Sequence, residues 1–270
     1  MFDVRLWVVT SEGAMSRWDE QNPMNFPRPG TRPPVDAPPL NPKATRRLLR
    51  KLAIWLLILV GLPYFLYKLN FPTYSWGQKT TVTVMTPAGE RSGSAVVQVR
   101  WADTPDILPD APTFQSDVRG EATVVDLGEG KYLFALIKGA ERRGIAMFGD
   151  GRSYWLEQIK TVAASRGETR EVPPAHRPLL VTFADINDPA SVARVDPDDL
   201  AASFGPGYAL SSITLAITDE PVTKGRVEAV LGWLGDYYNK HFDGNRLETV
   251  EAENRFANSL ASGDFDTEKN

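Results

Sequence analysis

The sequence predicts an α+β protein, in which one N-terminal transmembrane helix is followed by an extracytoplasmic domain of largely antiparallel sheet with a few short helices. Three observations lead to this prediction. Residues 46–71, RRLLRKLAIWLLILVGLPYFLYKLNF, form a long apolar run with basic residues at its start. Beyond residue 72 the apolar residues alternate with a period of two, and helical spacing returns only in short segments. With 270 residues and 42% hydrophobic composition, the chain is long enough for one or two ordinary domains.

Residues 1–45 are predicted to form a mostly disordered cytoplasmic tail. Residues 22–42 contain eight prolines, and proline is excluded from helix interiors and central strands because it lacks the amide donor and fixes φ. We therefore expect an extended spacer, and RPGTRPP also loosely resembles a ligand for aromatic proline-binding grooves. The first residues have no partner segment to pack against, so Met15 or Met24 is an alternative initiator to Met1.

The apolar run at 46–71 is predicted to be an uncleaved transmembrane signal anchor. Residues Leu52 to Tyr67 carry no charge and amount to about 24 Å of helix, and the apolar flanks from Leu48 to Phe71 extend the run beyond the ~30 Å hydrocarbon core. A soluble core helix would show a polar face, and a cleaved signal peptide would carry a small-x-small site. The run has neither, so it is expected to lie in the lipid bilayer.

Charge differs between the two sides of this run. The twenty residues before Leu52 contain six lysines and arginines, whereas the twenty after Tyr67 contain two. The positive-inside bias therefore predicts a cytoplasmic N-terminus and a periplasmic domain over residues 72–270. Residues 1–71 carry a net charge of +5 and residues 72–270 one of −9. Because the larger part is acidic and nucleic-acid binding needs a basic face, no nucleic acid is predicted among the partners.

Within residues 72–270, strands and helices are assigned from their periodicity. Two hairpins are predicted, one from strands at 79–86 and 94–101 around PAGERSG, the other from strands at 121–127 and 131–139 around GEG. The remaining predicted elements are strands at 144–151, 177–186 and 208–220 and helices at 153–165, 196–205 and 224–242. Asp196 is expected to cap the second of these helices, and the polar residues after Asp243 are expected to be loosely ordered.

The acidic segment DINDPASVARVDPDD, residues 185–199, is the strongest candidate site. Its start resembles the DxND linker of cadherin calcium sites, and its spacing partly matches an EF-hand loop from Asp185 to Asp196. The candidate calcium ligands are Asp185, Asn187, Asp188 and Asp196. Pro189 and Ala190 stand where an EF-hand needs a ligand and a glycine, so the alternative is an Asx turn followed by a helix cap. No other cofactor is predicted.

The sequence contains no recognisable catalytic motif. The chain has no cysteine and two histidines, which excludes disulfides, thiolate nucleophiles and a three-histidine metal site. No G-x-S-x-G motif marks a serine nucleophile. An envelope hydrolase would therefore depend on dispersed acid–base groups, with His176, Asp185 or Asp188 as candidates. His241 follows a predicted helix, where it favours the negative end of the helix dipole.

Two further patterns have structural explanations. GEGK and GDGR, at 128–131 and 149–152, are too short for a phosphate-binding loop and are typical of hairpin turns. The tryptophans Trp101, Trp155 and Trp233 are expected in the core, because large aromatic side chains dominate burial.

Residues 180–207, LVTFADINDPASVARVDPDDLAASFGPG, resemble stretches of uncharacterised, single-span proteobacterial inner-membrane proteins. The resemblance implies placement in a bacterial inner membrane and brings no functional residues with it. Together with the anchor and the lack of a catalytic motif, it leads to the hypothesis of a non-enzymatic accessory or protein-interaction role in the cell envelope. An envelope or membrane protein is the expected partner. An envelope hydrolase and a calcium-stabilised binding module are the alternatives.

Overall fold

The computed structural model describes residues 42–103, 114–152 and 154–267. The predicted proline-rich tail lies outside the described residues, apart from the last few positions before residue 46. The chain divides into two compact units, residues 1–61 and residues 62–270.

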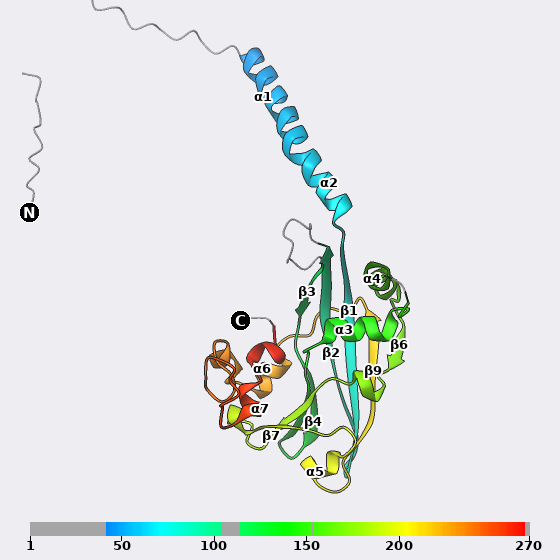
Figure 1. Cartoon of the computed structure of the whole chain (residues 1–270), viewed down its shortest axis with the longest axis vertical. Helices are drawn as coiled ribbons and strands as arrows, with labels where there is room; N and C mark the ends of the chain where they lie inside the picture. The colour runs from blue at the N-terminus through cyan, green and yellow to red at the C-terminus, as the bar shows by residue number, and fades with distance from the viewer. Residues whose placement is uncertain (1–41, 104–113, 153, 268–270) are drawn as a thin grey trace, which may run out of the picture. The chain divides into compact units, whose positions relative to one another are not determined.

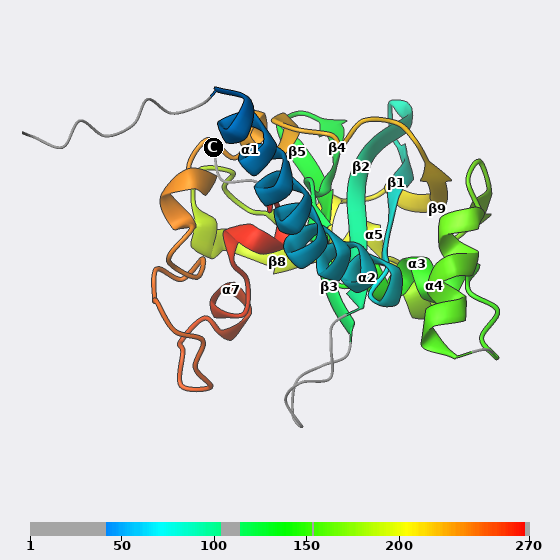
Figure 2. The ribbon, with the colours of Figure 1, turned by 90° about the horizontal axis from the view of Figure 1, so that it is seen from above.

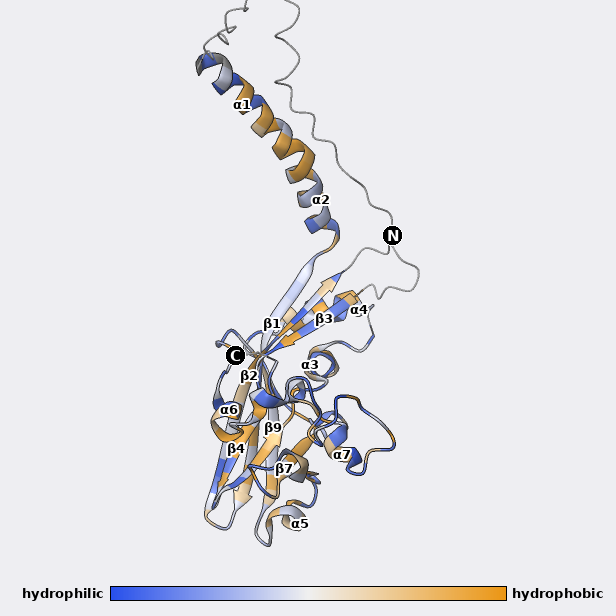
Figure 3. Ribbon diagram, turned by 90° about the vertical axis from the view of Figure 1, so that its left-hand side faces the viewer, coloured by the Kyte–Doolittle hydropathy of each residue, from blue (hydrophilic) through white to orange (hydrophobic). Residues whose placement is uncertain are grey.

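The predicted apolar segment is helical throughout. It consists of α1 (Pro42–Leu56), the π-helical turn η1 (Leu57–Gly61) and α2 (Leu62–Asn70). Residues Thr45–Asn70 are long and apolar enough to cross a membrane, and none of their most apolar part is buried in the protein. In Figure 3 the start of α1 is coloured as hydrophilic and the apolar colouring lies farther along, in the middle of the long helix. The π turn ends two residues before Pro63, whose missing amide and bulky ring interrupt α-helical bonding to the preceding turn.

A five-stranded antiparallel sheet forms one layer of the second unit. Its strand order is β3-β2-β1-β9-β6, with β1 at Thr73–Thr86, β2 at Gly89–Asp103, β3 at Phe114–Arg119, β6 at Thr169–Glu171 and β9 at Ala209–Thr218. The far end of β1 turns into β2 near α5 (Leu200–Phe204), as Figure 1 shows. The first predicted loop is too long, because Thr86 already pairs with Gly89 and residues 89–93 lie in the ladder. These residues are largely exposed, so the ladder continues there without the apolar alternation that predicts a strand.

A four-stranded antiparallel sheet packs against the first. Its order is β4-β5-β7-β8, with β4 at Thr123–Gly128, β5 at Lys131–Ala135, β7 at Leu180–Phe183 and β8 at Val192–Arg194. The predicted GEG hairpin is confirmed, with Glu129 (φ 55°) and Gly130 (φ 73°) both left-handed, as a type I′ turn requires. β4 crosses β2 so closely that a Cβ on Gly93 would lie 2.0 Å from the carbonyl oxygen of Val124. Glycine is therefore required at this crossing.

One predicted strand is a helix. Residues 144–151 belong mostly to α3 (Ala140–Phe148), whereas the predicted helix at 153–165 is confirmed as α4 (Trp155–Ala164). The strand prediction is wrong because a short apolar run does not distinguish a strand from a buried helix. α3 and α4 pack together at one flank of the five-stranded sheet, and α7 (Arg255–Asn258) lies away from them, beside β8 (Figure 2).

The long helix predicted at 224–242 is also broken. It is replaced by α6 (Arg226–Val230) and the 3-10 turn η4 (Leu234–Tyr237). Gly232 and Gly235 lie in this segment, and each glycine disfavours a helix by about 1 kcal/mol relative to alanine. The apolar stripe of the sequence is therefore buried by two short turns in place of one helix.

Residues 244–267 do not form the loosely ordered tail that their polarity predicts. The segment contains α7 and the 3-10 turn η5 (Ser262–Asp264), and Leu260 and Phe265 are fully buried. The ring of Phe265 packs against those of Phe134 and Phe242. A few isolated apolar residues thus join an aromatic cluster whose other members come from distant parts of the chain.

Candidate functional site

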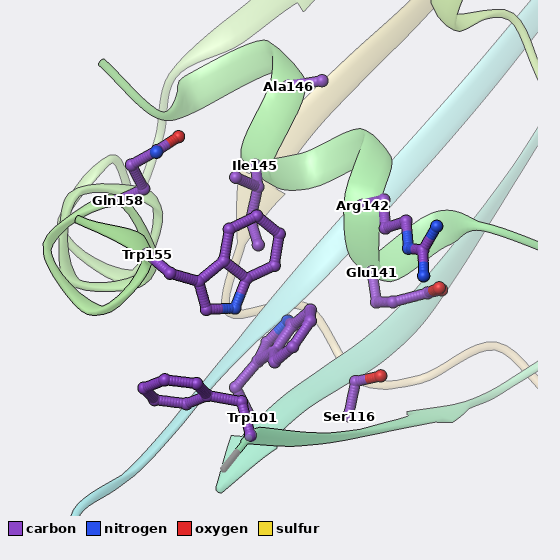
Figure 4. Close-up of a pocket in the computed structure, with 9 residues that line it drawn as sticks. Trp101, Ser116, Glu141, Arg142, Ile145, Ala146, Trp155 and Gln158 are labelled. Carbon is purple, nitrogen blue, oxygen red and sulfur yellow. The ribbon is translucent and has the colours of Figure 1, made fainter. Parts of the chain in front are cut away.

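A cleft of about 760 Å³ lies at one end of the five-stranded sheet. We call this the anchor end, meaning residues Thr73–Ser75 of β1 and the residues paired with them, because β1 begins three residues after α2. The walls of the cleft come from β2, β3, α3 and α4 (Figure 4). The principal side chains are Trp101, Phe114, Ile145, Trp155, Glu141 and Arg142. The volume is in the range of ordinary binding pockets, about 300–1,000 Å³, and we call it the Trp101 cleft.

Strand register and close helix packing position the walls of the Trp101 cleft. Trp101 and Ser116 are cross-strand neighbours, so both side chains point to the inner face of the sheet, which carries the core. On the same face Gln78 is fully buried, and its Nε2 donates to the carbonyl of Ala140 at 3.1 Å. A Cβ on Gly144 would lie 2.5 Å from Gln78 Oε1, so glycine allows α3 to rest directly on this side chain.

Two indole rings form the floor of the cleft. Trp101 is 6% exposed and Trp155 is 37% exposed, and their ring centroids lie 5.2 Å apart at an interplanar angle of 75° (Figure 4). The Nε1–H of Trp101 is buried and has no hydrogen-bond acceptor among the described residues. A buried donor left unpaired costs about 1–3 kcal/mol. The cleft therefore holds a hydrogen-bond donor that the rest of the described fold does not use.

The rim of the cleft is charged. Glu141 and Arg142 belong to the first turn of α3, and neither side chain makes a hydrogen bond or ion pair within the described part of the chain. The adjacent Arg143 is buried, and its guanidinium donates to the carbonyls of His176 at 3.0 Å and Lys138 at 3.1 Å. Burial lowers the pKa of Arg143 to about 10, and Glu141 opposes this shift. Arg143 thus fixes α3, while its two neighbours line the cleft.

The composition of the Trp101 cleft suits binding. Its floor is aromatic and apolar, the floor includes a buried N–H without an acceptor among the described residues, and its rim offers one charge of each sign. An extended peptide segment has this chemistry, since its carbonyls are free and its apolar side chains can pack on indole rings. Within the described ranges, no group of three or more His, Asp or Glu side chains is placed to hold a metal ion.

The predicted calcium ligands lie in two separate places. Asp185, Asn187 and Asp188 occupy the turn between β7 and β8, around the 3-10 turn η3 (Pro189–Ser191). Oδ1 of Asp185 accepts from the amide of Asn187 at 2.9 Å, and Oδ1 of Asp188 accepts from the amide of Ala190 at 3.0 Å. The hydroxyl of Ser191 donates to the carbonyl of Asp185 at 2.8 Å. These contacts are the Asx turn and cap of the alternative interpretation.

Asp196 lies at the other end of the same hairpin. Val181 pairs with Arg194, so the residues after Arg194 run beside the start of β7. At least about 10 Å of extended strand therefore separates Asp196 from Asp185, and the EF-hand arrangement that their spacing predicts is not formed. The N-cap of α5 is Asp199, whose side chain accepts from an amide of that helix, and not Asp196 as predicted.

The acid–base candidates are not brought together. His176 lies before β7 in the 3-10 turn η2 (Pro174–His176), whereas Asp185 and Asp188 follow that strand. The His176 side chain is exposed, and its backbone carbonyl binds Arg143. His241 follows η4, and its Nδ1 is buried without a partner among the residues that the structure describes. His176 therefore lies at the opposite end of β7 from Asp185 and Asp188.

Glu121 is a buried carboxylate with no signal in the sequence. One of its oxygens accepts from the amides of Arg226 at 2.9 Å and Val227 at 3.1 Å, at the start of α6, and the other has no partner in the described segments. Burial raises the pKa of Glu121, the two amides oppose the shift, and Asp266 adds to it. Its partners are more than a hundred residues away in the chain, so no local pattern could reveal the role of Glu121.

Comparison of the chain with protein families, with curated proteins and with solved structures finds no match. The interpretation of the Trp101 cleft therefore rests on its geometry alone.

Proposed function

We propose that this chain is a single-span protein of a bacterial inner membrane, with its α+β domain in the periplasm. Its role is a non-enzymatic accessory one, in which the Trp101 cleft binds an extended segment of a partner protein of the cell envelope. The observation that carries the proposal is the unused chemistry of the cleft: a buried indole N–H without an acceptor, beneath a half-exposed second indole.

The placement is supported by the apolar helix and its flanks. Thr45–Asn70 meets the length and hydropathy of a membrane span. Residues 32–51 contain six lysines and arginines against two in residues 68–87, so the N-terminal side of the apolar stretch is the more basic one. The positive-inside bias assigns that side to the cytoplasm. The resemblance of residues 180–207 to proteobacterial inner-membrane proteins agrees with this placement.

The role is supported by the residue types in the cleft. Tryptophan and arginine are the side chains that most often dominate protein–protein binding energies, and the cleft offers Trp101, Trp155 and Arg142 together. An extended segment would supply the carbonyl acceptor that the Trp101 N–H lacks. Such a contact would remove the cost of a buried unpaired donor on binding, and so favours the bound state.

Two reporters attached after residue 270 test the placement. Alkaline phosphatase is active only outside the cytoplasm, and a fluorescent protein of the conventional type matures only inside it. We expect phosphatase activity without fluorescence. Fluorescence without phosphatase activity would place the domain in the cytoplasm and contradict the proposal.

A pair of neighbouring substitutions tests the role. The full chain is crosslinked in intact membranes and purified, once as Trp155→Ala and once as Tyr154→Ala. Trp155 lines the cleft, whereas Tyr154 is 90% exposed and is not one of its lining residues. We expect a stoichiometric crosslinked partner to be lost with Trp155→Ala and kept with Tyr154→Ala. Equal recovery from both variants would show that binding does not use the cleft.

A further inference from the structure

A second cavity lies at the anchor end, on the outer face of the five-stranded sheet. It measures about 300 Å³ and is lined by Lys68 of α2 and by side chains of β1, β2 and β3. The strand residues include Ser75, Gln98, Arg100, Asp117 and Arg119. We call this set, with Lys68, the basic patch.

Strand register separates the basic patch from the Trp101 cleft. Ser75 pairs with Arg100, and Arg100 pairs with Asp117, so the three side chains share one face. Trp101 is the next residue along β2, and consecutive strand residues point to opposite faces. The anchor end of the sheet therefore has an aromatic inner side and a cationic outer side.

The basic patch contains more cations than carboxylates. Arg119 pairs with Asp117 at 3.2 Å, between two exposed side chains. Lys68 and Arg100 make no ion pair or hydrogen bond through their side chains within residues 42–103, 114–152 and 154–267. Three cations and one carboxylate leave a surplus of two positive charges, although residues 72–270 carry −9 in total. A local cationic surplus on an acidic domain favours an anionic ligand.

Chain connectivity keeps this patch close to the end of the apolar helix. Lys68 lies in the last turn of α2, and Thr73 follows Asn70 by three residues, which extended chain covers in about 10 Å. The amide of Asp103 donates to the carbonyl of Pro72 at 3.2 Å, so β2 returns to the same level. With the helix across a membrane, the patch lies beside the lipid headgroups, where charges interact over a Debye length of ~8 Å.

We propose that Lys68, Arg100 and Arg119 bind the phosphate of an anionic phospholipid headgroup. Arginine binds phosphate oxygens through two parallel N–H groups, and lysine adds a compact charge. Ser75 and Gln98 supply neutral donors beside them. The inference rests on the proposed membrane anchorage and adds to it a lipid preference and a contact that holds the domain at the bilayer surface.

Lipid retention by the full chain tests this site. The chain is reconstituted in nanodiscs of equimolar phosphatidylglycerol and phosphatidylcholine, and native mass spectrometry counts the lipids that stay bound. We expect phosphatidylglycerol to be retained preferentially, and Arg100→Gln or Arg119→Gln to reduce the preference about fivefold each. Arg91→Gln is the matched control, because Arg91 is exposed on the same strand at the hairpin end. The control should keep the wild-type preference.

Three results would overturn the lipid site. They are equal retention of the two lipids by the wild-type chain, an equal loss of preference in Arg91→Gln, and complete displacement of phosphatidylglycerol by millimolar inorganic phosphate, which would indicate a free-phosphate site. Carbonate extraction of native membranes separates this inference from the proposed function. Release of the chain by carbonate contradicts the anchorage, whereas a chain that stays in the membrane without lipid preference contradicts the lipid site alone.

Discussion

The acidic turn at residues 185–191 and the Trp101 cleft differ in what the fold does with their polar groups. In the turn, the carboxylates of Asp185 and Asp188 accept backbone amides within two residues of themselves. In the cleft, the indole N–H of Trp101 and the charges of Glu141 and Arg142 have no such partners among the described residues. The sequence of the turn resembles a calcium-binding motif more than the sequence around the cleft resembles any site. Its carboxylates, however, accept hydrogen bonds from backbone amides of the turn itself.

This difference teaches how to weigh candidate sites when geometry is the only evidence. Acidic side chains near glycine or proline usually satisfy local backbone donors, because Asp and Asn bond their own turns. A buried polar atom that no described residue satisfies has no such local explanation, and a ligand, a partner or an ordered water can each supply the missing hydrogen bond. For this reason we propose the cleft, and not the acidic turn, as the binding region.

The largest effect should come from Trp101. Trp101→Ala removes a buried indole from the floor of the cleft and should lower the free energy of unfolding by about 3–5 kcal/mol. Trp101→Phe keeps an aromatic ring in the floor and removes the unpaired donor, which offsets the loss of the second ring, so we expect a change within about 1 kcal/mol. Chemical unfolding of the full chain in neutral detergent, followed by circular dichroism, measures both. An equal loss of stability in Trp101→Phe and Trp101→Ala would show that the N–H of Trp101 stabilises the fold, and would contradict its description as an unpaired donor.

A helix-capping residue in the acidic segment should affect stability and leave partner binding unchanged. Asp199→Ala removes the N-cap of α5 and should cost about 1 kcal/mol of stability, with no loss of the crosslinked partner. The control is Asp198→Ala, since Asp198 makes an exposed ion pair with Arg177 at 2.8 Å and such pairs contribute no more than about 1 kcal/mol, often much less. A partner lost with Asp199→Ala while the fold survives would move function into the acidic segment.

Glu121 is intermediate between the satisfied carboxylates of the acidic turn and the unpaired N–H of Trp101. One of its oxygens accepts two amides, and the other has no partner among the described residues. Its effect on stability should depend on pH. Its folded pKa is raised above the ordinary value of 4.5. As pH rises above 4.5, the unfolded chain loses this proton before the folded chain does, so wild-type stability falls until the folded pKa is passed. Glu121→Gln keeps an oxygen for the α6 amides and lacks the charge.

The variant should therefore gain stability relative to wild type as pH rises from 4 to 7. Thermal midpoints of the two chains at matched pH measure this difference. A constant difference across the range would mean that the carboxyl of Glu121 titrates alike in both states.

Calcium should have the smallest effect. Because Asp196 is held away from Asp185 and the other carboxylates already accept amides, we expect millimolar calcium to leave the thermal midpoint unchanged. Ligand binding to the folded state alone would raise it in proportion to the logarithm of concentration over Kd. A calcium-dependent rise that disappears in Asp185→Asn would restore the calcium-stabilised module.

Sequence reasoning found the parts that depend on local pattern. Alternation along β1 and the glycines of the GEG connection at 128–130 carry their own signals, as does the helical face of α4. Sequence reasoning failed where contacts between residues far apart in the chain determine the structure. In the sequence, Gly144 belongs to a short apolar run that is predicted to be a strand. In the structure it lies in α3 and packs against the side chain of Gln78, which is sixty-six residues earlier in the chain.

The same limit explains why the Trp101 cleft was not predicted. Trp101 and Trp155 are separated by 54 positions, and tryptophans are expected in cores. Only the placement of α4 shows that Trp155 covers an unpaired indole. The one available signal was a second large aromatic residue at the start of an amphipathic helix, and that signal is too common to be specific.

Site-specific photocrosslinking tests the central claim most directly. A photoreactive p-benzoylphenylalanine replaces Arg142 at the cleft rim in one full-length chain and Asn187 in the acidic turn in another, both positions being exposed. The account predicts one discrete adduct from position 142 that disappears when Trp155→Ala is added, and none from position 187. An adduct from position 187 alone, or one from 142 that is indifferent to Trp155, would contradict the assignment of the Trp101 cleft as the binding site.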